Sequence, residues 1–309
     1  MQLKNRIFLI TGGTGSLGQE LTKQILAESS RKVIIYSRGE CKQVEMRRSF
    51  DNPRLRFFIG DVRDLDRLKM ALRGVHYVIH AAALKGVDVC AYNPFEAIQT
   101  NIIGAQNVAE ASIERKVKKV IAISSDKAAN PINLYGASKL CADKLFIASN
   151  AYSGKRGTEF SVVRFGNFEN SNGSVLPYWR DLVLNGSDTI PVTDPQMTRF
   201  TIRIEKAAEF VLKVLQKSNA GEIWCPKMNA YSVLSLAKEN YPDKEIKIIG
   251  KRPGEKLHED MIVCDDSDRT YETDYGFVTL PEFGWMQSCK PKDSQKVSKR
   301  FQYSSELAP

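Results

Sequence analysis

Residues 6–18 read RIFLITGGTGSLG, so a short apolar run leads directly into a glycine-rich turn. Gly12, Gly15 and Gly18 recur at every third position, and a helix-like segment continues to about residue 28. Glycines at such a turn allow the backbone to approach a pyrophosphate, and the N-terminus of the helix that follows favours negative charge. The stretch therefore predicts the first strand, turn and helix of a Rossmann domain that binds a dinucleotide.

Apolar runs and helix-like segments alternate through the rest of the first half of the chain. Further strands are predicted at 32–37, 56–62, 77–82, 119–125 and 159–165, and helices at about 94–115 and 134–152. This alternation predicts an α/β fold, a doubly wound parallel-sheet Rossmann fold with helices on both faces. After about residue 166 glycine, asparagine, serine and proline become frequent, and short strands mix with helices. We therefore expect a Rossmann domain with the catalytic residues over 1–166, a smaller C-terminal substrate-binding lobe over 167–285 with some segments returning to the Rossmann domain, and a basic tail over 286–309.

The composition narrows the kinds of ligand and location. A formal net charge of +9 suits an anionic ligand. The basic residues are dispersed except between Lys290 and Arg300, which we expect to be a solvated end, so no nucleic acid is expected. The six cysteines show no CxxC pair and no Cys/His cluster. They indicate free thiols in a reducing compartment and no metal site. With no run of about 20 apolar residues and no signal-peptide cleavage site, we expect a cytoplasmic protein with no membrane span.

The residues that end the second strand indicate which dinucleotide is bound. An NAD enzyme usually has an acidic residue there, which bonds the ribose hydroxyls. This chain instead has Ser37 and Arg38, with Lys42 one helical turn further on. Hydroxyl, guanidinium and ammonium groups suit a 2′-phosphate. We therefore predict NADP, while the nearby Glu40 keeps NAD as the alternative.

A second motif carries the chemistry. Tyr135 and Lys139 form YxxxK, whose spacing places both side chains on one helical face. We expect the ammonium to lower the pKa of the phenol, so that a phenolate accepts a proton from an alcohol as hydride leaves its carbon. Ser125, Asp126 and Lys127 end the fifth strand just before this helix. An Asp-Lys pair adds an acid and a base to the redox site; the alternative is a salt-bridged surface loop.

These motifs resemble those of the C5-inverting UDP-N-acetylglucosamine 4,6-dehydratases, a branch of the extended short-chain dehydrogenase/reductase superfamily. The catalytic segment is SSDKAANPINLYGASK. The other matching segments, in chain order between about residues 5 and 260, are TGGTGSLG, YSRGE, HAAALK, YNPFEAIQTN, RFGNFENSNGSVLP, VTDPQMTRF and RPGEKLHE. The departures are Ser125 where the family usually has threonine, the loop Lys85-Gly86-Val87-Asp88, and FENSNGS.

The resemblance implies a reaction. Tyr135 would take the proton of the sugar 4-hydroxyl while hydride passes to NADP, and Lys139 would hold the nicotinamide ribose. Asp126 and Lys127 would remove the proton at carbon 5 and assist loss of the 6-hydroxyl as water; which is acid and which is base stays open. Return of the hydride to carbon 6 and reprotonation of carbon 5 from the opposite face would turn UDP-GlcNAc into UDP-2-acetamido-2,6-dideoxy-β-L-arabino-hexos-4-ulose. A 4-epimerase, a retaining dehydratase and a non-catalytic NADP sensor are the alternatives.

The resemblance also implies the binding residues. Those expected at the cofactor are Gly12, Thr14, Gly15, Ser16, Leu17, Gly18, Ser37, Arg38, Lys42, Asp61, Val62, Ala81, Ala82, Lys85, Asn101, Tyr135 and Lys139. Those expected at the nucleotide sugar are Lys85, Asn167, Val175, Thr193, Met197, Arg199, Arg252 and Glu255. Arginines suit a diphosphate and a carboxylate suits ribose hydroxyls, although each alone is equally a surface charge. Asp61 has a helix N-cap as its alternative role. We also expect a homo-oligomer, a dimer or higher, formed by the helices at 94–115 and 134–152.

Overall fold

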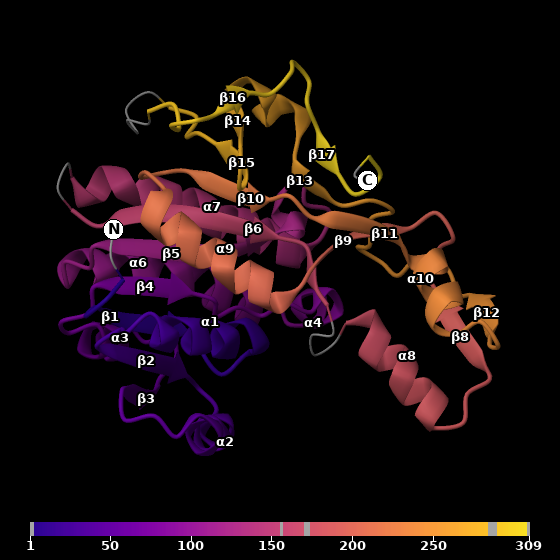
Figure 1. Ribbon diagram of the computed structural model, residues 1–309, viewed down its shortest axis with the longest axis horizontal. Coiled ribbons are helices and arrows are strands. Elements are labelled where there is room, and N and C mark those ends of the chain that lie inside the picture. Colours follow the sequence, from indigo (N-terminus) through magenta and orange to yellow (C-terminus); the bar gives the residue numbers. More distant parts are fainter. Residues whose placement is uncertain (1–2, 155–156, 170–173, 284–288, 308–309) are drawn as a thin grey trace.

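The computed structural model describes residues 3–154, 157–169, 174–283 and 289–307. Within them the main sheet has the strand order β16-β14-β15-β10-β6-β5-β4-β1-β2-β3 (Figure 1). All neighbours from β10 to β3 pair in parallel, whereas β15, β14 and β16 add an antiparallel edge. The predicted doubly wound parallel sheet is therefore confirmed. The main-sheet strands are β1 (Ile7–Thr11), β2 (Lys32–Ser37), β3 (Leu55–Ile59), β4 (Tyr77–His80), β5 (Lys119–Ser125), β6 (Glu159–Phe165), β10 (Ile223–Pro226), β14 (Thr270–Thr273), β15 (Gly276–Thr279) and β16 (Gln295–Lys296).

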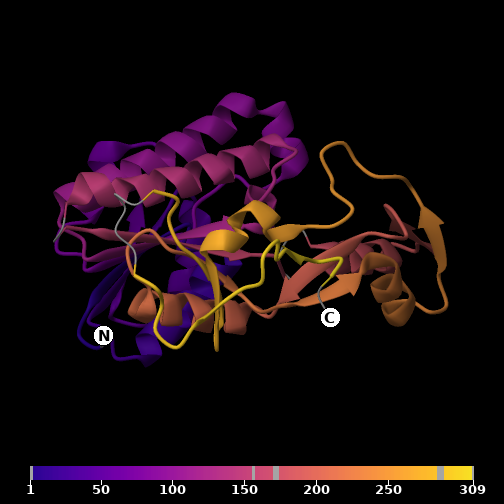
Figure 2. The same ribbon diagram turned by 90° about the horizontal axis from the view of Figure 1, so that it is seen from above.

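Helices cover both faces of this sheet, and the apolar pattern of the strands explains why. Phe8 and Ile10 of β1 pack into the core beneath α1 and α9, whereas Leu9 between them faces the core beneath α3, α6 and α7. A strand buried on both faces is a continuous apolar run, as residues 7–10 (IFLI) are. Figure 2 shows the magenta α7 on one side of the sheet and the orange α9 on the other. The covering helices are α1 (Ser16–Ala27), α2 (Glu40–Phe50), α3 (Leu65–Ala71), α6 (Gly104–Glu114), α7 (Leu134–Ser153) and α9 (Ile204–Lys217).

The helix predicted at about 94–115 is interrupted. The structure has α4 (Val87–Tyr92) and α5 (Pro94–Ile98), then a π-helical turn, η1 (Gln99–Ile103), which leads into α6. Within the turn Asn101 accepts a hydrogen bond from Leu84 N at 2.9 Å and donates to Leu84 O and to Ser138 Oγ, both at 2.9 Å. A π turn shifts the register of a helix locally and often lies at a functional site. Here the π turn points the side-chain amide of Asn101 toward the loop that follows β4.

The second half of the chain builds a small lobe that projects from the carboxyl ends of the parallel strands (Figure 1). Its core contains Trp179, Ile190, Met197 and Val233. Its sheets order the strands as β11-β9-β7 and β12-β8. The elements are β7 (Asn167–Phe168), α8 (Val175–Leu184), β8 (Thr189–Val192), β9 (Thr198–Ile202), β11 (Asn229–Ser232), α10 (Val233–Asn240) and β12 (Glu245–Ile248). Residues 170–173 of the matched RFGNFENSNGSVLP segment and the predicted boundary at 285 lie outside the described residues.

The lysines and arginines between Lys290 and Arg300 are exposed, as expected of a solvated segment. β16 pairs with the edge strand β14, and β17 (Tyr303–Ser304) pairs with β13 (Asp260–Ile262) near the carboxyl ends of the parallel strands. The Tyr303 hydroxyl accepts a hydrogen bond from Met228 N at 2.6 Å, and its ring packs 4.8 Å from that of Phe200. The short 3-10 turns η2 (Asp126–Ala128) and η3 (Cys264–Arg269) complete the elements. The backbone of this segment nevertheless pairs with β14, and the residues that follow Arg300 pack against the fold.

Candidate active site

The glycine turn after β1 makes a cradle that only glycine permits. Gly12 has φ +65°, and a Cβ there would lie 2.9 Å from Ala82 Cα. A Cβ on Gly18 would lie 2.6 Å from Gly13 Cα, so α1 starts against the turn itself. Gly15 is the N-cap of α1 and supplies no side-chain cap, which leaves the first amides of the helix for another partner. This combination fits the pyrophosphate of a dinucleotide.

The far end of the predicted cofactor site lies where β2 and β3 end. Arg38 and Lys42 are exposed there, and the Ser37 hydroxyl accepts a hydrogen bond from Gln43 Nε2 at 3.0 Å. Arg38 Nη1 lies 3.8 Å from Asp61 Oδ2. These groups lie together as expected. Asp61 is not the cap of the next helix, because Asp64 takes that position and accepts a hydrogen bond from Arg67 N.

Asp61 itself is held by Arg63. Arg63 Nη2 and Nε donate to Asp61 Oδ2 at 2.7 and 3.0 Å. Burial raises the pKa of Asp61, but the hydrogen bonds and charge of Arg63 outweigh that effect and lower it. The carboxylate is therefore charged and fixed at the edge of the adenine end, where Val62 packs beneath it against Gly104.

The predicted catalytic residues converge where β5 ends and α7 begins. Asn133 caps α7 by accepting a hydrogen bond from Gly136 N at 2.8 Å, so Tyr135 lies in the first turn. Gly136 makes the approach possible, because a Cβ there would collide with the Lys127 carbonyl oxygen. The YxxxK helix therefore starts in contact with the turn that carries Asp126.

Asp126, Lys127 and Ser125 form one connected group. Asp126 is 1% exposed, and its Oδ1 accepts hydrogen bonds from Ser125 Oγ at 2.8 Å and from Lys127 Nζ at 3.1 Å. Oδ2 of Asp126 is buried and has no hydrogen-bond partner among the described residues. The pair is thus buried beside Tyr135 and is not the exposed, salt-bridged loop that we held as the alternative.

The electrostatics of Tyr135 differ in one respect from expectation. Burial raises the pKa of Tyr135 to about 12, and the groups that oppose this effect are the Ser125 hydroxyl and the charge of Lys127. Lys139 Nζ instead donates to Ile123 O at 2.6 Å, and burial lowers the pKa of Lys139. The ammonium that counteracts the desolvation of the phenol in this structure is that of Lys127.

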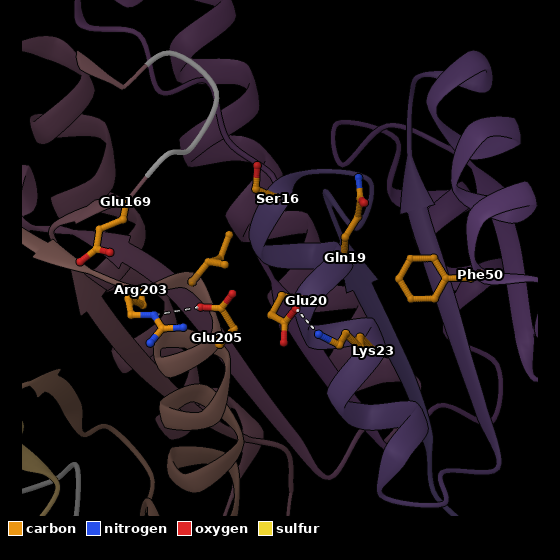
Figure 3. A pocket seen from close by; sticks show the side chains of 9 residues that line it. Ser16, Gln19, Glu20, Lys23, Phe50, Glu169, Arg203 and Glu205 are labelled. Atoms are coloured by element: carbon orange, nitrogen blue, oxygen red, sulfur yellow. Dashed lines mark hydrogen bonds and ion pairs between the residues drawn. The ribbon is translucent and has the colours of Figure 1, made fainter. Parts of the chain in front are cut away.

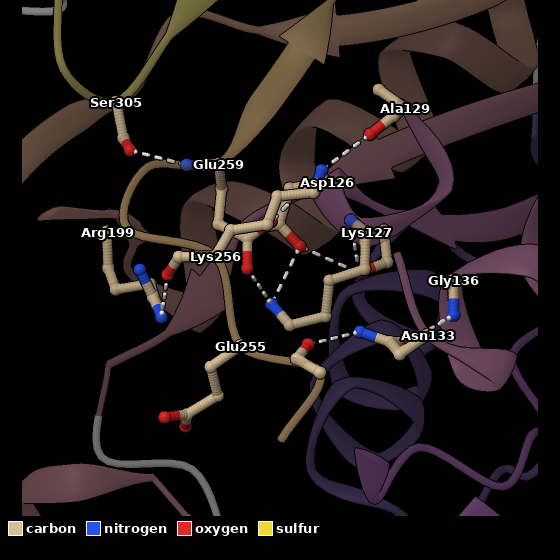
Figure 4. A network of polar contacts seen from close by, with 12 residues as sticks. Asp126, Lys127, Ala129, Asn133, Gly136, Arg199, Glu255, Lys256, Glu259 and Ser305 are labelled. Atoms are coloured by element: carbon tan, nitrogen blue, oxygen red, sulfur yellow. Dashed lines mark hydrogen bonds and ion pairs between the residues drawn. The ribbon is translucent and has the colours of Figure 1, made fainter. Parts of the chain in front are cut away.

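One buried acid was missed by the sequence reasoning. Oε1 of Glu259 lies 3.2 Å from Lys127 Nζ, opposite Asp126 (Figure 4). Glu259 belongs to the matched segment RPGEKLHE, from which only Arg252 and Glu255 were selected. The available signal was the acid at the end of that segment, which Asp260 separates from the short apolar run at residues 261–263.

The RPGEKLHE segment, residues 252–259, lies across the start of α7. Asn133 Nδ2 donates to Gly254 O, and Lys256 Nζ donates to Ala129 O, both at 2.8 Å (Figure 4). The guanidinium of Arg199 is turned toward the same segment and donates to Leu257 O at 2.9 Å and to Lys256 O at 3.0 Å. Arg199 therefore anchors this segment and is largely buried, whereas the expectation was an arginine available to a diphosphate.

The other predicted substrate residues lie in several separate places. Arg252 and Glu255 pair with each other, with Arg252 Nε donating to Glu255 Oε1 at 2.8 Å, and the arginine side chain is 74% exposed. Met197 is buried in the lobe core, with Val175 packed against that core, and its sulfur accepts a hydrogen bond from Thr193 Oγ1 at 3.0 Å. Asn167 lies on β7 beside Tyr231, to which it is hydrogen-bonded. The remaining predicted position, Lys85, lies in the loop after β4. Its neighbour Leu84 is held there by a hydrogen bond from Leu84 N to Asn101 Oδ1.

A separate hollow of about 570 Å³ opens beside α1. It is lined by polar and charged side chains from α1, α9 and the segment before α9, including Gln19, Glu20 and Arg203 (Figure 3). Of the predicted cofactor residues it contains only Ser16. Within it Glu20 pairs with Lys23 and Arg203 with Glu205. It holds none of the predicted catalytic groups.

Two features of the described residues bear on the other expectations. No helix among them is long and apolar enough to cross a membrane, and no group of three or more His, Cys, Asp or Glu side chains is placed to hold a metal ion. Cys41, Cys90, Cys141, Cys225, Cys264 and Cys289 are all free thiols.

A doubly wound sheet with a glycine cradle after β1, and a Tyr-Lys pair on the helix after β5, define a short-chain dehydrogenase/reductase of the extended type, with a C-terminal lobe over the sheet. Within that class, the chain belongs to the family described as "Polysaccharide biosynthesis protein", whose model matches residues 8–280. The resemblance drawn from the sequence motifs is thereby confirmed.

Two named proteins and one solved structure are similar to this chain over most of its length. A protein of Campylobacter jejuni named UDP-N-acetylglucosamine 4,6-dehydratase (inverting) is 48% identical over 97% of this chain and 92% of its own length. A UDP-glucose 4-epimerase of Rickettsia akari is 38% identical over 91% of this chain and 84% of its own. The solved structure of Pen from Bacillus thuringiensis is 34% identical, with a TM-score of 0.92, and covers 99% of this chain and 94% of its own.

Proposed function

We infer that this chain is a UDP-N-acetylglucosamine 4,6-dehydratase that inverts carbon 5, with UDP-2-acetamido-2,6-dideoxy-β-L-arabino-hexos-4-ulose as its product. The observation that carries this inference is the buried Asp126–Lys127 pair beside Tyr135. A dehydrogenase or epimerase moves a proton and a hydride at one carbon and needs no second acid-base pair. The near-complete match to the inverting dehydratase of Campylobacter jejuni supports the same reaction.

The cofactor that we propose is NADP, held at the pyrophosphate by the glycine turn. The exposed Arg38 and Lys42 at the end of β2 support NADP over NAD, because a 2′-phosphate attracts both. When bound, the nicotinamide supplies an acceptor that takes hydride from carbon 4 of the sugar and returns it to carbon 6. Lys139, whose Nζ donates to Ile123 O at 2.6 Å, is the residue that we assign to the nicotinamide ribose.

Tyr135 takes the proton of the 4-hydroxyl. Its phenol is costly to ionise because it is buried, and the Ser125 hydroxyl and the charge of Lys127 both favour the ionised form. The Ser125 hydroxyl has one proton, which it donates to Asp126 in this structure and which would turn to the phenolate when Tyr135 ionises. The 4-keto group that results acidifies the proton at carbon 5.

We assign Asp126 as the base and Lys127 as the acid of the elimination. Lys127 lies between two carboxylates, and although burial lowers its pKa, Asp126 and Glu259 outweigh burial and raise it, so the amine is charged. Asp126 takes the carbon 5 proton on its unpartnered Oδ2, the C6–O bond breaks, and Lys127 gives its proton to the departing hydroxyl, which leaves as water. Because Asp126 Oδ1 lies 3.1 Å from Lys127 Nζ, the proton on Asp126 returns to the amine. When carbon 5 is protonated from the opposite face, Tyr135 gives up the proton that it took from the 4-hydroxyl, so no proton is gained or lost over the cycle apart from those in the water released.

Residues of the C-terminal lobe, of segment 252–259 and of the loop after β4 are assigned to the nucleotide sugar. The Arg252 side chain is 74% exposed and that of its partner Glu255 13% exposed, and we assign them to the diphosphate and the ribose. Asn167 and Lys85 are assigned to the sugar. Thr193, Val175 and Met197 are assigned to the uridine side of the lobe, where Met197 acts through its backbone because its side chain is buried.

Incubation with UDP-GlcNAc in heavy water tests this function. We expect a 4-keto-6-deoxy product with deuterium at carbon 5, inverted at that carbon by NMR. Recovery of the unchanged sugar would remove the dehydratase assignment. A product inverted only at carbon 4 would establish the 4-epimerase, the second candidate, which is favoured by the Rickettsia relative. Retention at carbon 5 would establish a retaining dehydratase.

We also propose that the chain forms a homo-oligomer. Tyr92 and Phe95, on α4 and α5, are 89% and 81% exposed, and Val89 and Ile98 add to the same apolar surface. Large apolar side chains gathered on one surface commonly mark a protein interface. Light scattering coupled to size exclusion checks this, and a monomer at micromolar concentration would contradict it. A cytoplasmic location, expected from the cysteine pattern, stays a prediction.

A further inference from the structure

Glu259 is a buried acid that the reaction above does not yet use as a working group. It lies directly before β13, its side chain is 2% exposed, and Oε1 lies 3.2 Å from Lys127 Nζ. Its other oxygen, Oε2, is buried without a hydrogen-bond partner among the described residues and forms only a longer ion pair with Lys256 Nζ at 3.7 Å. A buried carboxylate oxygen without a partner costs stability, so a structural role alone is a poor account of it.

Lys127 is thereby held from two distant parts of the chain. Asp126 approaches its ammonium from the turn after β5, and Glu259 approaches from the segment that crosses the start of α7 (Figure 4). The two carboxylates together fix the position of Nζ. With a single carboxylate partner, the long lysine side chain could rotate about that one ion pair. A lysine has a flexible four-carbon stem, so a second anchor restricts it to one geometry.

The backbone of Glu259 is fixed as firmly as its side chain. Glu259 N donates to Ser305 Oγ and Ser305 N donates to Glu259 O, both at 2.9 Å. The same Ser305 hydroxyl lies 2.8 Å from Thr198 Oγ1 on β9. The strand pairing of β13 with β17 continues these contacts. The carboxylate is therefore placed by three segments, none of which contains a predicted catalytic residue.

We propose that Glu259 is a positioning residue for the elimination step, which holds Lys127 as an ammonium aimed at the departing 6-hydroxyl. This proposal rests on the dehydratase function inferred above. The other charged or titratable groups that face Lys127 are Asp126, Arg199 and Tyr135, with Lys256 beyond Glu259. Without Glu259, one anion, Asp126, faces Lys127 and Arg199, so Lys127 loses its proton more readily and its amine is less well placed. Both proton transfers of Lys127, to the departing hydroxyl and from Asp126, are then slower.

The test compares Glu259→Gln with Glu222→Gln. Glutamine keeps the size of the side chain and removes its charge. Glu222 is an equally buried glutamate that binds Asn219 and Trp224 away from the site, so it reports the general effect of this substitution in a core. We expect Glu259→Gln to lower kcat about 10²-fold with little change in KM, and Glu222→Gln to keep both, once each variant is shown to be folded by circular dichroism.

A second measurement does not depend on substrate. Pulsed acylation of lysines over a range of pH, with mass spectrometry of the peptide that contains Lys127, reports how readily its amine loses its proton. We expect Lys127 in Glu259→Gln to react at lower pH than in the wild type or in Glu222→Gln. Glu259→Asp retains the charge and is expected to react closer to the wild type.

Each result decides something. Wild-type kcat and unchanged Lys127 reactivity in Glu259→Gln would overturn the proposal, as would an equal shift in Glu259→Asp and Glu259→Gln. If the wild type fails to convert UDP-GlcNAc, the proposed function fails. The acylation comparison still shows in that case whether Glu259 holds the ammonium of Lys127.

Discussion

Replacing Lys127 by methionine tests whether this one ammonium neutralises both buried carboxylates. Methionine keeps the volume of the stem and removes the charge, so Asp126 and Glu259 are left facing each other. Removing one partner of a buried ion pair costs about 3–5 kcal/mol. Because the Lys127 side chain remains 20% exposed, we take the lower end and expect Lys127→Met to lower the free energy of unfolding by about 3 kcal/mol at pH 7.

The pH dependence of this loss identifies its cause. Burial already raises the pKa of Glu259, with the charge of Asp126 adding to it and that of Lys127 opposing it. Without Lys127 the pKa of the pair rises further above its value in the unfolded chain, near 4.3 for glutamate. A carboxyl group with a raised pKa contributes stability that is fully present below the unfolded pKa and is lost as pH rises through the folded pKa. We therefore expect the penalty of Lys127→Met to shrink to about 1–2 kcal/mol at pH 5.

Urea denaturation of wild type and variant at both pH values measures this difference. Lys69→Met is the matched control, because the Lys69 side chain is 19% exposed, close to the 20% of Lys127, but its carboxylate partners, Glu110 and Glu114, are about half exposed. An exposed carboxylate is solvated without its partner, so the control penalty is expected to be the same at both pH values. An equal penalty for Lys127→Met at pH 5 and pH 7 would refute the reasoning.

Three further predictions concern the cofactor, the helix start and the phenol. Arg38→Ala combined with Lys42→Ala should weaken NADP binding about tenfold and leave NAD binding unchanged, as measured by calorimetry; equal weakening of both would remove the 2′-phosphate assignment. Gly136→Ala should cost about 1–3 kcal/mol and lower kcat about 10²-fold, because its Cβ displaces Lys127 from α7; unchanged kcat would contradict that contact. Ser125→Ala should raise the pKa of Tyr135 and move the acidic limb of the kcat profile to higher pH; an unmoved limb would exclude Ser125 from tuning the phenol.

The parts of the site that local sequence predicts are those built within one βα unit. The turn after β1 and the motif around Tyr135 are each formed by residues that are close in the chain, so spacing alone indicates their geometry. Glu259 could not be found in this way, because its partner Lys127 lies in a distant segment and the two meet only through the tertiary fold. Arg199 was predicted as a substrate residue, but its guanidinium binds backbone carbonyls of residues 256 and 257, which no pattern of charges indicates.

The fold shows the same division. Both-face burial makes the parallel strands continuous apolar runs, and all those predicted in the first half are present. The π turn at Gln99–Ile103 was missed because its sequence has helical periodicity, and the shift in register is imposed by the contacts of Asn101. The lysines and arginines of the C-terminal segment are exposed as expected, whereas the packing of Tyr303 beyond them was not predicted, because a single aromatic anchor leaves no pattern in the sequence.

The contacts of Ser305 also have a consequence for how the protein is made. A ribosome releases β1 to α7, with Tyr135 and Asp126, long before it releases β17. Until residue 305 emerges, the backbone of Glu259 lacks the partner that fixes it, so the nascent chain carries a folded nucleotide domain with an unfinished acid-base centre. Because Glu259 positions Lys127, we expect a chain cut short just before β17 to convert its sugar slowly, with kcat lowered about as much as in Glu259→Gln.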